Sequence, residues 1–380
     1  MRLFGIDAFT GAQVVVSFDS VISGVDELVT PLEGLPYVAP GWIDLQVNGY
    51  AAVDYNNPAT SHEEIARSLA AQHEAGTTRI LPTVITGPPG DMAGSLRNLA
   101  KAKDAAGCAS IEGFHVEGPH ISPEDGPRGA HPARWVRPPD LDEYRRWQGA
   151  AEGQVKLVTL APEWPGATGY IEELLRDGVV AAIGHTNAST QQIQDAVSAG
   201  ATMSTHLGNG AHSMLPRHPN YIWDQLAEDR LVASFIVDGH HLGVSYFKAA
   251  LRAKGVIRSV LVTDAAMPAG AAPGVYRLGE VDVELKADGR VVLRGENRLA
   301  GSALRMDEAI SNTIRQTGAS LAEAVTMATR NPARVGRVAG RQRGLVPGER
   351  ADLVVFELDG HTKSLRVVGT YVAGEQIFSR

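Results

Sequence analysis

The sequence predicts an α/β protein: a TIM-like (β/α)8 barrel with a small β-rich unit built from both chain ends. Two observations favour the barrel. Eight short apolar segments lie between residues 42 and 265, and most are followed by a helical pattern, as parallel strands with crossover helices require. The 380 residues also suffice for a barrel of ~250 residues plus a second unit.

The second unit is indicated by the two ends of the chain. Residues 12–24 alternate apolar and polar positions, which is typical of half-buried antiparallel strands. The segments after position 350 are again short strands separated by polar turns. We therefore expect residues 1–40 and 345–380 to form one small β-sandwich domain, and residues 41–344 to form the barrel.

The expected barrel strands follow one another along the middle of the chain. They are residues 42–48, 79–86, 110–118, 154–162, 179–186, 201–209, 231–239 and 259–265. Several helices between them begin with a serine followed three residues later by Glu or Gln, the spacing of a capping box. These pairs are Ser61 with Glu64, Ser189 with Gln192, and Ser320 with Glu323.

Three longer segments interrupt the alternation of strand and helix. Residues 118–139 and 207–222 are irregular, and residues 272–300 resemble a hairpin insert. Long loops at strand ends are usually functional. We therefore expect these segments to help form the site.

Composition limits the possible partners and location. The net charge of −8 gives no basic surface for nucleic acid or an anionic membrane, so an anionic substrate needs a local cationic group. Cys108 is the only cysteine, which excludes an internal disulfide. The first residues lack the apolar core of a signal peptide, and no segment approaches the ~20 apolar residues of a membrane span. These features predict a cytoplasmic enzyme.

Four of the expected strands end with a carboxylate or imidazole side chain, the groups that bind divalent metals: Glu117, His185, His206 and Asp264. The carboxyl ends of barrel strands meet on one face, so these side chains should gather there. One carboxylate and two imidazoles leave a fourth metal position for water, the pattern of a catalytic zinc site. A carboxylate opposite can move protons for that water. The sequence therefore predicts a metal-dependent hydrolase rather than a site that only stabilises the fold.

At this point the chain resembles a known family, the N-acetylglucosamine-6-phosphate deacetylases of the amidohydrolase superfamily. The resemblance rests on motifs that run in order from about residue 41 to 355. They are GWIDLQVNG, FHVEGPHISPEDGPRGAHP, VTLAPE, IGHTNA, THLGNGA, VDGHHL, LVTDAAMPAG and LAGSALRMDEAI. The resemblance implies hydrolysis of the acetamide of an N-acetylated amino-sugar 6-phosphate, with Glu117, His185 and His206 as metal ligands and Asp264 as the catalytic aspartate.

The resemblance also bears on the number of metal ions. Wider relatives place a His-x-His pair at the end of the first strand, which supports a second metal. This chain has Gln46 and Asn48 there, and amides bind transition metals poorly. We expect one divalent ion per subunit, Zn²⁺ first, with Fe²⁺, Co²⁺ or Mn²⁺ also compatible with the ligands. Lys156 opens its strand, so we interpret it as structural rather than as a bridging ligand.

Substrate contacts are likewise implied by the resemblance. His131 matches a histidine that reaches the acetamide carbonyl, and Asn209 and Gly210 match contacts to the ligand. His241 aligns with the substrate histidine of the family, with His240 as the alternative. Arg217 matches an arginine that reaches the phosphate in the neighbouring subunit, which implies a homodimer. A guanidinium suits phosphate because it offers a planar pair of donors.

One departure from the family leaves the substrate open. The family commonly has an aromatic residue where this chain has Gly208. Its loss opens the pocket, so N-acetylgalactosamine 6-phosphate or an unphosphorylated sugar remains an alternative. A cyclic-amide hydrolase is less favoured because the His-x-His pair is absent.

Overall fold

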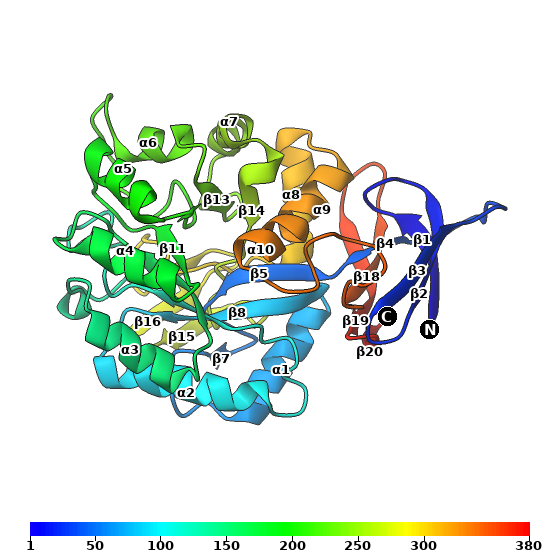
Figure 1. Ribbon diagram of the computed structural model, residues 1–380, viewed down its shortest axis with the longest axis horizontal. Coiled ribbons are helices and arrows are strands. Elements are labelled where there is room, and N and C mark those ends of the chain that lie inside the picture. Colours follow the sequence, from blue (N-terminus) through cyan, green and yellow to red (C-terminus); the bar gives the residue numbers. More distant parts are fainter.

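The computed structural model describes residues 1–380, and its centre is a barrel of eight parallel strands (Figure 1). In chain order these are β5 (Trp42–Val47), β8 (Thr77–Ile85), β9 (Phe114–Glu117), β10 (Val155–Leu160), β11 (Val180–Ile183), β12 (Met203–Ser204), β13 (Val232–Phe235) and β14 (Ser259–Leu261). Their order around the sheet equals their order in the chain, and a parallel bridge between Val47 and Ala265 links its two ends. The predicted (β/α)8 barrel is confirmed.

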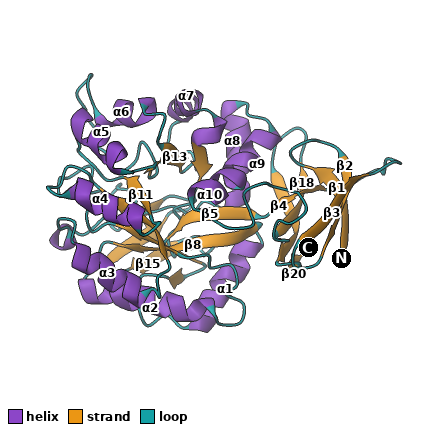
Figure 2. Ribbon diagram, viewed as in Figure 1, coloured by secondary structure: helices purple, strands orange, loops and turns teal.

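Helices surround the barrel strands (Figure 2). They are α1 (His62–His73), α2 (Pro89–Lys103), α3 (Leu141–Ala150), α4 (Ala167–Arg176), α5 (Thr190–Ala199), α6 (Tyr221–Ala227), α7 (Val244–Lys254), α8 (Met306–Thr317), α9 (Leu321–Ala328) and α10 (Arg330–Val335). All three expected capping boxes are present, at the starts of α1, α5 and α9. None of the helices combines the length and apolar character that crossing a membrane requires.

The strands from both chain ends form a separate seven-stranded sheet beside the barrel (Figure 1). They are β1 (Arg2–Asp7), β2 (Gln13–Phe18), β3 (Ile22–Glu27), β4 (Tyr37–Pro40), β18 (Leu353–Leu358), β19 (Leu365–Val372) and β20 (Glu375–Ser379). Strand β4 joins the two ends, because it pairs with β1 on one side and β18 on the other. The sheet folds over, so that Phe18 on β2 contacts Tyr371 on β19 at 5.7 Å between ring centroids.

A buried ion cluster fastens this sheet to the barrel. Asp352, which is fully buried just before β18, lies 2.8 Å from Nε of Arg79 on β8 and 2.7 Å from Nη1 of Arg341. Burial alone would raise the pKa of Asp352, but Arg341 and Arg79 bring it down to about 2. The stabilisation is therefore complete above the unfolded pKa of ~3.9 and is lost as the pH falls toward about 2.

Removing the charge of Asp352 should destabilise the fold. Asp352→Asn leaves two buried guanidinium groups without a counter-ion, and breaking a buried pair in this way costs about 3–5 kcal/mol. We expect a lower midpoint in urea unfolding at pH 7. Asp142→Asn, which breaks an exposed pair with Arg145, is the control and should change the unfolding free energy by less than ~1 kcal/mol. Equal midpoints for the two variants would contradict the role of the cluster.

The insert at 272–300 forms a three-stranded antiparallel flap, defined here as β15 (Gly274–Leu278), β16 (Val281–Leu285) and β17 (Val291–Leu293). It is attached to the loops at the carboxyl ends of the barrel strands. The Gly279 N–H donates at 2.8 Å to Asp54 of β7 (Val53–Asp54), which pairs with β6 (Gly49–Tyr50). The indole N–H of Trp135 donates to Glu280 at 2.6 Å. The flap therefore covers the end of the barrel where the site was expected.

Candidate active site

Four residues at strand ends come together at this end of the barrel. Glu117 is the last residue of β9, and His185, His206 and Asp264 follow β11, β12 and β14. These last three have positive φ angles of 51°, 30° and 50°, a conformation that costs energy for residues other than glycine. Such strain is typical of functional sites, and here it occurs where the chain turns away from the strand.

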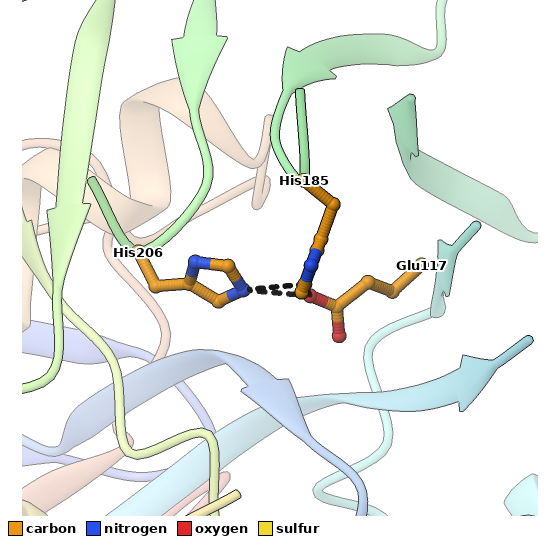
Figure 3. Close-up of side chains that lie close together, drawn as sticks. All are labelled: Glu117, His185 and His206. Carbon is orange, nitrogen blue, oxygen red and sulfur yellow. Dashed lines mark hydrogen bonds and ion pairs between the residues drawn. The ribbon is translucent and has the colours of Figure 1, made fainter. Parts of the chain in front are cut away.

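Glu117, His185 and His206 converge on one point (Figure 3). The Glu117 Oε1 atom lies 3.1 Å from His185 Nε2 and 2.8 Å from His206 Nε2, and the two Nε2 atoms are 3.1 Å apart. All three residues are buried. Burial would raise the pKa of Glu117, but its contacts with His185 and His206 hold it well below the usual range.

The donor pattern of this cluster fits a bound cation. The Nδ1 atom of His185 is 2.8 Å from the Pro127 carbonyl oxygen, to which it must donate. The Nε2 atom of a neutral His185 then carries a lone pair directed at a carboxylate oxygen, and two acceptors do not attract each other. A divalent ion between them satisfies both, and one carboxylate with two imidazoles is a ligand set that zinc accepts.

Asp264 lies beside the cluster and is held by two amides. The side chains of Gln46 and Asn48 donate to its Oδ1 at 3.1 and 2.6 Å, and Gln46 also donates to Glu117 Oε2 at 3.0 Å. The two amides thus orient both carboxylates. Burial, together with the nearby charge of Glu117, raises the pKa of Asp264 to about 6.

Four of the five expected substrate residues line the same cavity of about 530 Å³: His131, Asn209, Gly210 and His241. His131 Nδ1 is 2.8 Å from the Thr86 hydroxyl, and its ring lies edge-on to His185 at 4.5 Å. Burial, reinforced by His185, lowers the pKa of His131 to about 3, so this imidazole is neutral at pH 7.

The loop after β12 must approach His185 closely. Gly210 has φ +56°, and a Cβ atom there would lie 2.5 Å from His185 Nδ1. Gly208, where the family commonly has an aromatic residue, has φ +101°, and a Cβ atom would lie 2.8 Å from the ring of Tyr246. Tyr246 of α7 therefore occupies the space next to the missing side chain.

Arg217 and the two neighbouring histidines are placed differently. Arg217 is exposed and does not line the cavity of its own chain. His241 lines the cavity, with its Nδ1 2.7 Å from Asp238, whereas His240 is exposed and contacts the Asp288 carbonyl of the flap at 3.1 Å. His241 is therefore the histidine that faces the site.

Lys156 does not belong to the site. It lies near the start of β10 and its Nζ is 2.6 Å from Glu112, another residue at the opposite end of the strands from Glu117. This position agrees with a structural role.

The cavity also includes residues that the sequence did not single out. They come from the β5–α1 loop, from α2 and from the flap, and include Asp54, Asn56, Asp91, Ser95, Arg277 and Glu280. The polar segment DYNNPAT (residues 54–60), which follows the first barrel strand, could have indicated that the β5–α1 loop contributes to the site. The insert at 272–300 was expected to help form the site, and its residues 277–281 do line the cavity. Nothing in the sequence placed α2 there.

Comparison with known proteins gives a consistent result. A model described as the amidohydrolase family matches residues 37–377. The N-acetylglucosamine-6-phosphate deacetylase of Bacillus subtilis (strain 168) is 33% identical over 337 residues, covering 88% of this chain and 83% of that protein. The N-acetylgalactosamine-6-phosphate deacetylase of Escherichia coli O157:H7 is 32% identical over 357 residues, covering 92% of each.

Solved structures of deacetylases are also similar to this chain. The N-acetyl-D-glucosamine-6-phosphate deacetylase of Mycobacterium smegmatis has a TM-score of 0.90 and 31% identity, with 100% of both chains covered. An aspartate-to-alanine mutant of that enzyme, in complex with N-acetyl-D-glucosamine-6-phosphate, also has a TM-score of 0.90. The chain therefore belongs to the metal-dependent amidohydrolase family, in the group of the N-acetylglucosamine-6-phosphate deacetylases, and is a hydrolase of acetamide C–N bonds.

Proposed function

We propose that this enzyme hydrolyses the acetamide of N-acetyl-D-glucosamine 6-phosphate to D-glucosamine 6-phosphate and acetate, in the catabolism of amino sugars. The observation that carries this proposal is the position of Asp264, a carboxylate that Gln46 and Asn48 hold beside the three converging residues Glu117, His185 and His206 in one cavity. The similarity to deacetylases over most of the chain supports the substrate class. The cytoplasmic location stays a prediction.

The proposed metal is a single divalent ion, Zn²⁺ in the first place, held by Glu117, His185 and His206. Such an ion would polarise the acetamide carbonyl and lower the pKa of the attacking water. The proposal of one ion rests on Gln46 and Asn48, whose amide groups already donate to the carboxylates. Metal analysis of the purified protein should give about one ion per chain, and two tightly bound ions would contradict this role of the amides.

Asp264 carries the proton transfers in this mechanism. Its Oδ1 accepts bonds from Gln46 and Asn48, which leaves Oδ2 to accept the proton of the attacking water. The same carboxyl group then gives that proton to the nitrogen of the leaving amine, which must be protonated to depart.

His131 is proposed to bind the carbonyl oxygen. If the Thr86 hydroxyl donates to Nδ1, the proton of the neutral ring is on Nε2 and can be donated to the substrate. A donor there stabilises the negative charge that develops on this oxygen in the transition state.

The galacto epimer is a second candidate. Relatives named N-acetylgalactosamine-6-phosphate deacetylase are 32–33% identical to this chain, the same level as the gluco enzymes. Acetate release should be measured with both epimers, each with and without the 6-phosphate. The highest kcat/KM for N-acetylglucosamine 6-phosphate supports the proposal, and a higher value for any other sugar overturns it.

Arg217 is proposed to bind the 6-phosphate in the active site of a partner subunit, which is consistent with its exposure outside its own cavity. A charge-assisted contact of this kind contributes about 1.5–3 kcal/mol, so Arg217→Ala should lower kcat/KM for the 6-phosphate roughly 10–150-fold. An unphosphorylated N-acetyl sugar should be almost unaffected. An equal loss on both substrates would mean that Arg217 does not bind phosphate.

The sharing of Arg217 between subunits can be tested by mixing the impaired Arg217→Ala protein with the inactive Asp264→Asn protein, on the 6-phosphate substrate. A heterodimer of Arg217→Ala and Asp264→Asn chains has one site with both an intact Asp264 and the partner's intact Arg217. We expect activity to return when subunits exchange. If exchange is demonstrated by mass spectrometry without recovery, Arg217 does not act across an interface.

A further inference from the structure

The cavity extends beyond the candidate site residues, toward α2. This extension, here called the α2 arm, is lined by Asn56, Pro58, Thr86, Asp91, Met92 and Ser95. It begins at Thr86, whose hydroxyl contacts His131, and reaches the surface at Pro58 and Asp91, which are exposed. The whole cavity of about 530 Å³ falls in the range of ~300–1,000 Å³ typical of pockets that enclose a small molecule.

The α2 arm lies across the barrel from the expected sugar contacts. Thr86 follows β8, whereas Asn209 and Gly210 follow β12. These two strands are four places apart in the eight-stranded order, so they lie on opposite sides of the barrel. Glu117 at the end of β9 and His185 after β11 lie between these two strands in the order, and His206 follows β12 itself.

The shape of an amide then determines what occupies the α2 arm. A secondary amide is planar and trans, so its two carbon substituents point in opposite directions, about 3.8 Å apart. If the sugar carbon on nitrogen lies near Asn209 and His241, the acyl carbon on the carbonyl side points toward Thr86. The carbonyl itself remains beside His131 and Glu117.

We propose that the α2 arm is an acyl subsite, and that the enzyme hydrolyses N-acyl amino-sugar phosphates whose acyl group is longer than acetyl. This inference rests on the proposed function. Water adds across the C–N bond: the acyl carbon gains the hydroxyl, and the nitrogen gains the proton. The products are therefore the free amino sugar phosphate and a carboxylate of unchanged length.

The lining of the α2 arm indicates which acyl groups it takes. Met92 is buried and offers an apolar wall, and Ser95 is 1% exposed, with a hydroxyl that has no hydrogen-bond partner. Asp91 is the one carboxylate of the arm itself, and the carboxylates of Asp54, Glu64 and Glu280 line the same cavity, in which Arg277 is the only guanidinium. Neutral or cationic acyl ends should therefore be preferred over anionic ends.

The first test compares N-acetyl, N-propionyl and N-butyryl derivatives of glucosamine 6-phosphate with the wild-type enzyme. We expect kcat/KM for the longer groups to lie within about 16-fold of acetyl, since each buried methylene contributes at most about fourfold and N-butyryl adds two. A closed acetyl pocket would instead reject N-butyryl by about 100-fold or more, which overturns the acyl subsite. Inactivity on all three, acetyl included, would refute the proposed function instead.

The second test fills the α2 arm. Ser95→Leu should lower kcat/KM for N-butyryl at least tenfold while acetyl changes by less than about twofold, because only the longer chain reaches Ser95. Circular dichroism and metal content establish that this variant is folded. An equal loss on both substrates by a folded variant would place the sugar, not the acyl group, in the α2 arm.

The third test changes the charge at Asp91, at the exposed end of the α2 arm, and so leaves the buried side chains of the arm unchanged. The N-β-alanyl derivative is cationic and N-succinyl is anionic, and both place their charge beyond two methylenes. We expect kcat/KM to favour β-alanyl by about tenfold at low ionic strength, less in high salt. Asp91→Lys should reduce this preference by at least about threefold. Asp142→Lys, the same change in the first turn of α3, is the control, and a matching effect there would overturn the assignment.

Discussion

Replacing Asp264 by Asn should lower kcat by roughly 10²–10⁴-fold, the usual contribution of general acid–base catalysis. The amide oxygen of the substituted side chain can still accept the bonds from Gln46 and Asn48, so the side chain should keep its place. It cannot take up a proton from water at neutral pH. Single-turnover acetate release with a metal-replete variant measures the loss of the chemical step.

Substrate binding should survive in this variant, which permits a structure with intact substrate. Asp140→Asn is a suitable control, because Asp140 caps α3 through its side chain and Asn is an equally good cap. The control should keep near-native kcat. Near-native kcat in metal-replete Asp264→Asn itself would reject Asp264 as the proton carrier.

Replacing His206 by Ala should remove most bound metal and nearly all activity. His206 Nε2 is within 3.1 Å of both Glu117 Oε1 and His185 Nε2, so the truncation deletes one of three protein ligands. Metal content by mass spectrometry and activity should fall together. The far-ultraviolet circular dichroism should remain that of a folded barrel, because the remaining strands are unaffected.

His73→Ala gives a matched control for the loss of a buried imidazole. His73 lies at the end of α1 and contacts Ser110, and neither residue lines the cavity. It should retain full metal occupancy even if its stability falls. Full occupancy in His206→Ala would contradict the assignment of this residue as a ligand.

The barrel and the position of Glu117, His185, His206 and Asp264 were predictable for a physical reason. Each residue directly follows an apolar strand, and the ends of parallel strands in a closed barrel meet on one face. Side chains at these strand ends point to the same centre, where one metal ion can contact Glu117, His185 and His206. The capping boxes were predictable as well, because the interaction is local in sequence.

The extent of the cavity was not predictable from the sequence. Its α2 arm depends on Asn56, which bonds to the Ile85 N–H and the Thr83 carbonyl, and so fixes the β5–α1 loop against β8. The flap is placed by contacts such as that of Trp135 with Glu280, which are 145 residues apart. Pairings of this length leave no periodic signal. The sequence identified the amides Gln46 and Asn48 as poor metal ligands, but only the fold shows that both donate to Asp264.

The seven-stranded sheet has a consequence for synthesis on the ribosome. Strand β4 ends at Pro40, but its neighbour β18 begins only at Leu353. At ~5–20 residues per second, roughly 15–60 s of translation separate the two strands. During that time the edge of β4, with the apolar Val38 and Ala39, has no partner, and such edges promote aggregation. Nascent chains should therefore depend on chaperones until the last strands emerge, and slower translation should lengthen that dependence.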